Sequence, residues 1–338
     1  GQRRAGPGRR VKRPVREPVI RRAVHGVLLL DKPLGWSSND ALQKVKWLLR
    51  AEKAGHTGTL DPLATGLLPL CFGAATKFSQ VSLDADKSYR ATLRLGRTTT
   101  TGDAEGEVLQ VRAVTTLARE QVESSCAAFV GAIAQLPPMH SALKHEGRPL
   151  YAYARAGVDV ARARRDVTIH EIDVVAWHDD LLIVDVRCSK GTYVRTLAED
   201  IGEALGCGAH LVSLRRVRTG TFDESACISL DALEALGETE RERCLQPVDA
   251  LLTGHARIVL GADDAARFLT GLRRRGPWAD TARAAVYGPC EGEANLLLGT
   301  GHVQGGELIA DRLLTPVEIQ QTLARQDLLA APLHPVTS

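Results

Sequence analysis

The segment Gly-His-Thr-Gly-Thr-Leu-Asp-Pro-Leu-Ala-Thr-Gly, residues 55–66, is the most distinctive stretch of this 338-residue chain. It places three glycines, three threonines, a histidine and an Asp-Pro pair within twelve positions. Pro62 disfavours helical geometry at Asp61, and the glycines let the backbone approach a ligand closely. The segment therefore predicts a structured loop that presents a carboxylate.

Asp61 can be interpreted in two ways from these residues alone. A carboxylate held on a tight loop is a candidate nucleophile or general base. A purely structural role, in which Asp61 caps residues 63–68, accounts for the pattern at least equally well.

Regular elements are predicted on both sides of this loop. A buried strand at residues 25–30 ends in a turn, and a helix follows that Ser37 or Ser38 can cap, with Ala41 and Val45 on its buried face. Further along, the patterns predict a strand at 89–95, a helix at 115–130, a strand at 181–188 and a helix at 193–205.

A second candidate site is the turn Ser-Lys-Gly-Thr-Tyr-Val-Arg at residues 189–195. It places Tyr193 and Arg195 at the start of a helix. An arginine can pair with a carboxylate in a forked geometry and keep it ionised and oriented. Taken alone, the segment is equally typical of an ordinary strand-to-helix turn.

A third candidate is the segment Asp-Lys-Ser-Tyr-Arg at residues 86–90, where a strand begins. An aromatic ring flanked by cations suits stacking on an unstacked RNA base and contact with phosphates. A tyrosine at the start of a strand is more often part of a core.

Charge is distributed unevenly along the chain. Residues 1–22 hold nine basic residues and one acid, a net charge of +8. The whole chain has 43 basic and 40 acidic residues, so residues 23–338 hold 34 against 39 and carry −5. Prolines and glycines oppose a helix in this segment, and we expect a disordered basic tail that contacts phosphates.

Other classes of protein are disfavoured by what the sequence lacks. No apolar run reaches the roughly 20 residues needed to span a bilayer, so no membrane is expected. Seven scattered cysteines, an odd number without metal or redox spacing, favour a cytoplasmic protein with reduced thiols. No His-Glu-x-x-His pair or zinc deaminase signature is present, so no metal is predicted.

The length allows a main domain and a smaller one. The pattern changes near Pro247, and residues 256–315 predict a short strand, a helix at 263–272 and several short strands punctuated by glycine. These features predict a small second domain.

The three candidate segments, in this order and spacing, resemble the TruB family of tRNA pseudouridine synthases. The resemblance covers residues 24–250 closely, and residues 256–316 resemble the family's PUA-like RNA-binding domain. The motifs that carry it are GVLLLDKP at 26–33 with Ser37 and Ser38, GHTGTLDPLATGLLP at 55–69, KSYRATLRLG at 87–96, QLPPMHSALK at 135–144 and CSKGTYVRTLAEDIG at 188–202.

The resemblance implies an α+β fold, in which a catalytic domain with a mixed, largely antiparallel sheet is followed by a small C-terminal PUA-like β domain. The expected division is a disordered basic tail at 1–22, a catalytic domain at 23–250, a PUA-like domain at 256–316 and a C-terminal tail at 317–338, frayed from Asp327 onwards.

The resemblance also implies roles for individual residues. Asp61 is the essential carboxylate, Tyr89 stacks on the target base, and Arg195 is the partner of Asp61. Tyr193 and Leu214 are expected as pocket walls, and His56 as a contact to the everted loop. Lys32 and Arg215 complete the implied substrate-binding residues.

The implied reaction converts a T-loop uridine, at tRNA position 55, to pseudouridine without a cofactor. The N1–C1′ bond breaks, the uracil rotates and C5 joins C1′, after the base has been flipped out of its stack. The residues leave open whether Asp61 adds covalently or removes a ribose proton. The expected partner is the T-loop and elbow of tRNA, and the expected state is a monomer.

Two other functions were weighed. A protein that only binds and folds tRNA would not need Asp61, Tyr89 and Arg195 together. A T-loop uridine methyltransferase would need a glycine-rich cofactor-binding unit and a cysteine nucleophile, and the sequence shows neither.

Overall fold

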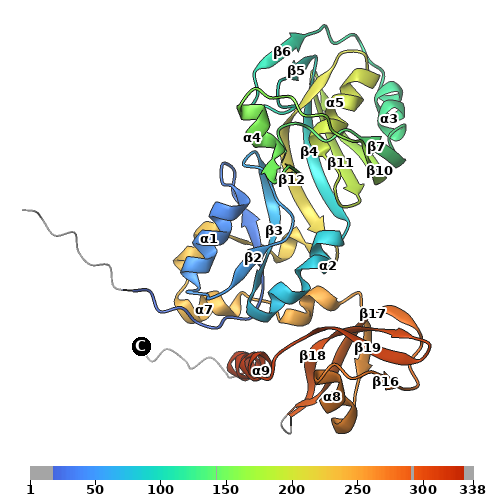
Figure 1. Cartoon of the computed structure of the whole chain (residues 1–338). Helices are drawn as coiled ribbons and strands as arrows, with labels where there is room; N and C mark the ends of the chain where they lie inside the picture. The colour runs from blue at the N-terminus through green and yellow to red at the C-terminus, as the bar shows by residue number, and fades with distance from the viewer. Residues whose placement is uncertain (1–17, 142, 291–292, 331–338) are drawn as a thin grey trace, which may run out of the picture.

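The computed structural model describes residues 18–141, 143–290 and 293–330, which build two β-sheets with helices packed around them. In Figure 1 the longer sheet runs through the upper two-thirds of the molecule, and the second sheet, orange to red, lies beyond its lower end. Within the described ranges, no helix combines the length and apolar character needed to cross a membrane.

The first sheet has ten strands and mixed directions. Only β1 with β14 and β3 with β12 pair in parallel, so the expected mixed, largely antiparallel sheet is confirmed. The strands along its main path are, in order, β14 (Ile228–Ser229), β1 (Gly26–Lys32), β3 (Ala64–Phe72), β12 (Ala209–Thr219), β4 (Lys87–Leu95), β11 (Leu181–Cys188), β10 (Arg165–His178) and β7 (Gly131–Gln135), with β2 (Ala54–His56) beside β3 and β13 (Phe222–Asp223) beside β12.

Short helices and two hairpins surround this sheet. The α-helices are α1 (Ser38–Leu48), α2 (Ser79–Asp84), α3 (Arg119–Ala127), α4 (Leu150–Arg155), α5 (Val194–Ala204), α6 (Leu230–Ala235) and α7 (Glu238–Arg243). Three 3₁₀ helices, η1 (Gly73–Phe78), η2 (Glu224–Ala226) and η3 (Val248–Leu252), and the hairpins β5 (Arg97–Thr99) with β6 (Val108–Val111) and β8 (Lys144–His145) with β9 (Arg148–Pro149) complete it.

The helix expected after the first strand is confirmed as α1. The Ser37 side chain accepts a hydrogen bond from the Asp40 N–H, and Ala41 and Val45 are buried. The helix expected at 115–130 is shorter, because α3 begins after Ala118, whose N–H is capped by the side-chain oxygen of Gln121 at 2.9 Å.

The second sheet has five strands and one covering helix, α8 (Ala262–Leu269). Its order is β15 (Ala256–Val259), β17 (Thr281–Cys290), β18 (Glu293–Gln304), β19 (Glu307–Leu313) and β16 (Arg274–Arg275). The expectation of uniformly short strands was wrong, since β17 and β18 have 10 and 12 residues. Glycines do not end these strands because register shifts, one of them at Gly299 with φ +155°, are accommodated as bulges.

The two sheets share one hydrophobic core. Val27 on β1 and Phe78 on η1 belong to the same buried cluster as Phe268 on α8 and Val286 on β17. Lys77 adds polar contacts, since its ammonium donates to the Leu313 carbonyl at 2.8 Å and pairs with Glu318.

Part of the expected C-terminal tail is a helix, α9 (Pro316–Ala330). Thr315 and Glu318 form reciprocal hydrogen bonds that begin it, and Ile319 is fully buried. The buried Arg325 donates to the Leu245 carbonyl at 2.5 Å. The expectation of a tail was therefore wrong for residues 317–330, and residues 331–338 lie outside the described part of the chain.

Most of the basic N-terminal segment, residues 1–17, lies outside the described part as well. The expected disorder was wrong for Arg22, which pairs with Glu238 at 3.1 Å and Glu242 at 2.9 Å. A backbone bridge to Ala51 adds to these contacts. The ordered chain therefore begins before the predicted boundary.

Candidate active site

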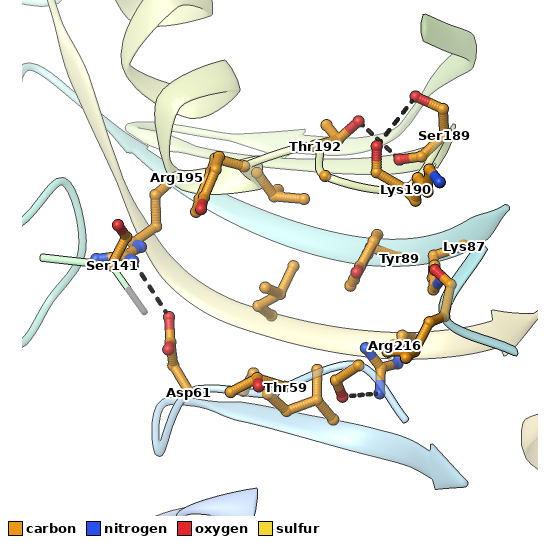
Figure 2. A pocket seen from close by; sticks show the side chains of 18 of the residues that line it. Thr59, Asp61, Lys87, Tyr89, Ser141, Ser189, Lys190, Thr192, Arg195 and Arg216 are labelled. Atoms are coloured by element: carbon orange, nitrogen blue, oxygen red, sulfur yellow. Dashed lines mark hydrogen bonds and ion pairs between the residues drawn. The ribbon is translucent and has the colours of Figure 1, made fainter. Parts of the chain in front are cut away.

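A pocket of about 460 Å³ lies where the loop between β2 and β3 faces the turn that leads into α5 (Figure 2). Strands β4 and β12 form its floor. Its lining includes five of the residues expected from the resemblance and several cations: Asp61, Tyr89, Tyr193, Arg195 and Leu214, with Lys87, Arg165, Lys190 and Arg216.

The register of β4 and β12 explains why Tyr89 and Leu214 lie together. Tyr89 is opposite Arg216, and Ala91 is opposite Leu214. Because side chains alternate along a strand, these residues share one face of the sheet. Arg215, between Leu214 and Arg216, is directed to the other face.

The loop that carries Asp61 is held by neighbouring elements. The Ser38 hydroxyl bonds both the N–H and the carbonyl of Leu60, at 2.7 and 2.8 Å. The Thr57 and Ser82 hydroxyls are 2.8 Å apart. These bonds fix the backbone on which Asp61 stands, while its side chain remains 52% exposed.

The capping role considered for Asp61 does not match the structure. Residues 64–68 belong to strand β3 and not to a helix. The Ala64 N–H donates to the Asp61 carbonyl, at 2.9 Å, and not to its carboxylate. The carboxylate instead faces Arg195, with Oδ2 3.5 Å from Nη2 (Figure 2).

Arg195 lies in the first turn of α5 with only 10% of its side chain exposed. The fork considered for the pair with Asp61 is not formed, because the guanidinium serves several acceptors. Nη2 also donates to the His140 carbonyl at 2.5 Å, and Nη1 donates to the Thr101 carbonyl at 3.4 Å. Nη1 lies 3.9 Å from the buried carboxylate of Asp103, so Arg195 stands between two acids.

Gln135 fixes the turn before α5. Its side-chain oxygen accepts the Tyr193 N–H at 2.9 Å, and its amide donates to the Tyr193 carbonyl at 3.2 Å. Gln135 is 1% exposed, so this pair of bonds is shielded from water. It holds the backbone that positions both Tyr193 and Arg195.

Arg216 and Lys87 place two buried cations at the base of the pocket. Arg216 is 1% exposed and donates to the carbonyls of Leu67 and Gly58, at 2.8 and 3.0 Å. Lys87 donates to three carbonyls near the end of α2, and burial lowers its pKa to about 8. Burial also raises the pKa of Tyr89, with Arg216 opposing that shift.

Sequence reasoning named Lys87 only as a cation beside Tyr89 and Gln135 only as part of a motif, and it did not select Arg216 or Asp103. Lys87 precedes Tyr89 by two positions and Arg216 follows Leu214 by two, so strand alternation could have identified both. Asp103 and Gln135 give no comparable signal, because their contacts join segments far apart in the chain.

Three of the expected substrate-binding residues do not line this pocket. Arg215 pairs with Asp31 at 3.0 Å and Glu224 at 2.7 Å on the opposite face. Lys32 is fully buried, and its ammonium lies under the turn formed by residues 33–36. His56 lies on β2, and burial, aided by Arg216, lowers its pKa. The described residues contain no cluster of three or more acids, histidines or cysteines able to hold a metal.

Two sequence models of one protein family match the chain. The one described as the N-terminal domain of TruB family pseudouridylate synthase matches residues 46–194. The one described as the tRNA pseudouridylate synthase B C-terminal domain matches residues 195–253. The two matches adjoin at Arg195 and together cover more than half of the chain.

Curated relatives are similar over nearly their whole length. A protein named tRNA pseudouridine synthase B from Verminephrobacter eiseniae is 59% identical over 317 residues, covering 92% of this chain and 95% of that protein. One of the same name from Ralstonia nicotianae is 56% identical, covering 91% and 98%.

Solved structures show the same fold. A chain in the crystal structure of a Cbf5-Nop10-Gar1 complex matches with a TM-score of 0.65 and 24% identity, over 87% of each chain. A chain in the archaeal box H/ACA sRNP Nop10-Cbf5 complex matches with a TM-score of 0.65 and 23% identity, over 88% of each chain.

Proposed function

The chain belongs to the TruB family of pseudouridylate synthases, and we propose that its pocket converts a T-loop uridine of tRNA into pseudouridine. The reaction is an isomerisation, in which the N1–C1′ bond breaks and a C5–C1′ bond forms. The proton lost from C5 is balanced by the proton gained at N1. This proposal rests on one observation: Asp61 and Arg195 face each other in a pocket that Tyr89 also lines.

Asp61 is proposed as the reacting carboxylate. It is the acid that lines the pocket beside Tyr89, and its half-exposed side chain can reach a nucleotide that enters from solvent. Addition to the substrate and removal of a ribose proton both require an ionised carboxylate. The adjacent Arg195 guanidinium, with Nη2 3.5 Å from Oδ2, is proposed to orient the carboxylate.

Arg195 is proposed to orient Asp61 rather than to contact the base. Its side chain is anchored from behind by the carbonyls of His140 and Thr101 and by Asp103. A cation held in this way keeps its direction when the substrate arrives, which is the condition for electrostatic preorganisation.

Tyr89, Tyr193 and Leu214 are proposed to enclose the flipped uracil. A ring and an aliphatic side chain hold a base by stacking and packing without fixing its rotation. The uracil must turn between bond cleavage and rejoining, so this kind of contact suits the reaction. Tyr89 is also placed to assist removal of the C5 proton.

His56 and Arg215 are proposed as RNA contacts outside the pocket, and the fully buried Lys32 is proposed to act indirectly, through the turn that its ammonium holds. Residues 256–316 are proposed as a PUA-like RNA-binding domain beside a catalytic domain at 23–250. We further propose a cytoplasmic monomer, which light scattering of the purified protein and fractionation of cells would test.

The decisive experiment incubates the full chain with an unmodified tRNA transcript and no added cofactor, and maps pseudouridine at single-nucleotide resolution. We expect one modified site, in the T-loop. A matched transcript with cytidine at that position should stay unmodified. Tight binding of tRNA without any pseudouridine would instead support a protein that only folds or escorts tRNA.

A further inference from the structure

The turn between β1 and α1 exposes two large apolar side chains. Leu34 is 66% exposed and Trp36 is 36% exposed, although only Gly35 separates them. Single exposed apolar residues are ordinary, whereas a leucine and a tryptophan presented together on one turn form an apolar contact surface.

This turn is held rigidly from below. The ammonium of the fully buried Lys32 donates to the Pro33 carbonyl at 2.9 Å and to the Trp36 carbonyl at 2.6 Å. Gly35 adopts φ +86°, a conformation that other residues rarely reach. The exposure of Leu34 and Trp36 is therefore built into the backbone and does not result from a loose loop.

The same turn is bonded to the loop that carries Asp61. The Gly35 N–H donates to the Pro62 carbonyl at 2.8 Å, next to Asp61 in the chain. Ser38, two residues after Trp36, bonds Leu60 from the other end. The exposed tryptophan therefore lies on a turn that is bonded directly to the loop carrying Asp61.

We propose that this turn, residues 33–37, is an RNA-contact element in which Trp36 stacks on an unpaired base of bound tRNA. The proposal rests on the proposed function, because a loop from which one base is flipped presents further unstacked bases near the pocket. Aromatic rings on RNA-binding proteins hold such bases by stacking, and Leu34 extends the apolar surface.

Trp47 provides a matched control. It is also exposed, at 53%, and lies near the other end of α1. Its ring is covered by the Lys44 ammonium, 5.0 Å from the centroid, and it has no bond to the Asp61 loop. Removing either tryptophan deletes a similar exposed surface, and only Trp36 is placed to meet RNA bound at the pocket.

The test compares Trp36→Ala, Trp36→Phe and Trp47→Ala in the full chain, each with its melting temperature measured. We expect Trp36→Ala to weaken binding of the tRNA transcript about tenfold, within the range for loss of one stacked base. Trp36→Phe should retain most of the affinity, and Trp47→Ala should bind as wild type. Single-turnover rates at saturating tRNA should stay within about twofold for all three.

Fluorescence gives a second readout, since the chain has four tryptophans. Binding of tRNA should quench emission of the wild type, and most of that quenching should be absent in Trp36→Phe and present in Trp47→Phe. Transcripts with a single abasic site at each T-loop position would identify the stacked base. On the transcript that lacks this base, Trp36→Ala should cause no further loss of affinity.

Unchanged affinity and quenching in the Trp36 variants would overturn the proposal, as would equal losses in the Trp36 and Trp47 variants. Failure of the proposed function would look different. The wild type would then make no pseudouridine in the same reactions, whatever the tryptophan variants do to binding.

Discussion

Strands β4 and β12 present two faces with different chemistry. On the pocket face, Arg216 is buried and donates to the backbone carbonyls of Leu67 and Gly58. On the opposite face, its neighbour Arg215 forms ion pairs with Asp31 and Glu224. Adjacent arginines on one strand therefore face different surroundings, as the alternation of side chains along a strand requires.

The two faces also differ in how much their charged residues contribute to the stability of the fold. Partly exposed ion pairs such as Arg90 with Asp185 stabilise a fold by about 0–1 kcal/mol, because water already solvates both charges. A cation buried among carbonyls must give up its hydration, which is costly, and this cost favours a functional explanation. Substitutions on the pocket face should therefore lower the enzymatic activity, whereas substitutions on the outer face should leave it largely unchanged.

The largest contrast is expected between two aspartates. Asp61→Asn should reduce the single-turnover rate at least about a thousandfold, or about 4 kcal/mol, because an amide is neither nucleophile nor base. Asp185→Asn on the outer face should stay within about twofold. tRNA binding by Asp61→Asn should persist. A rate within tenfold of wild type for Asp61→Asn would contradict its assignment.

A smaller loss, about a hundredfold, is expected for Arg195→Lys. An ammonium cannot reach Asp61, Asp103 and the His140 carbonyl together, because it lacks the planar spread of a guanidinium. Arg90→Lys on the outer face is the control and should retain full activity. Near-normal turnover of Arg195→Lys would reduce Arg195 to a generic positive charge.

The neighbouring arginines give the most direct comparison of faces. Arg216→Met should lower turnover by about tenfold or more, because it removes the bond to Gly58 and loosens the loop that carries Asp61. Arg215→Met should stay within about twofold. The same initial-rate assay serves both, and a larger loss for Arg215→Met would instead restore the expectation that Arg215 contacts RNA.

The smallest effect is a pH dependence of stability at the base of the pocket. Burial lowers the pKa of Lys87 to about 8 in the folded chain, below the ordinary lysine value of 10.5. Between these values the unfolded chain binds the extra proton, so the Lys87 contribution to stability rises with pH. From pH 8 to 9.5 this rise should be about 1–2 kcal/mol.

Urea denaturation at the two pH values would measure it. Between the two pH values, the free energy of unfolding should rise by about 1–2 kcal/mol less in Lys87→Met than in wild type. Comparing the two proteins cancels the contributions of the other titrating groups. Lys44→Met, which removes an exposed ion pair with Glu234, is the control and should match wild type. An unchanged difference in Lys87→Met would show that its pKa is ordinary.

Much of the fold could be anticipated from local pattern. The helix after Ser37 and strand β11 follow from capping and alternation, and α9 was missed because its apolar spacing is weak and its anchors are distant. Arg325 reaches the Leu245 carbonyl, a contact across 80 positions that no local pattern reports.

The site residues that belong to recognisable motifs were predicted from the sequence. Residues that join the site through contacts between distant segments were missed. Asp61, Tyr89 and Arg195 were selected by residue type and resemblance, and the structure brings them to one pocket. The expected substrate-binding residues included Arg215, whereas the pocket is lined by Arg216, one position further along and on the other face of the strand. Their roles in the reaction stay predictions until variants are assayed.

The position of β12 has a consequence for the order in which the molecule is made. Strands β3 and β4 follow one another in the sequence. In the sheet, however, they are separated by β12, a strand that comes much later in the chain and ends at Thr219. A nascent chain that has released Asp61 and Tyr89 from the ribosome has no template that sets their separation. The pocket forms only after about two-thirds of the chain has been synthesised, and such long-range pairing is slow. Folding should therefore be limited by the docking of β12, and an unfinished chain cannot hold a uridine.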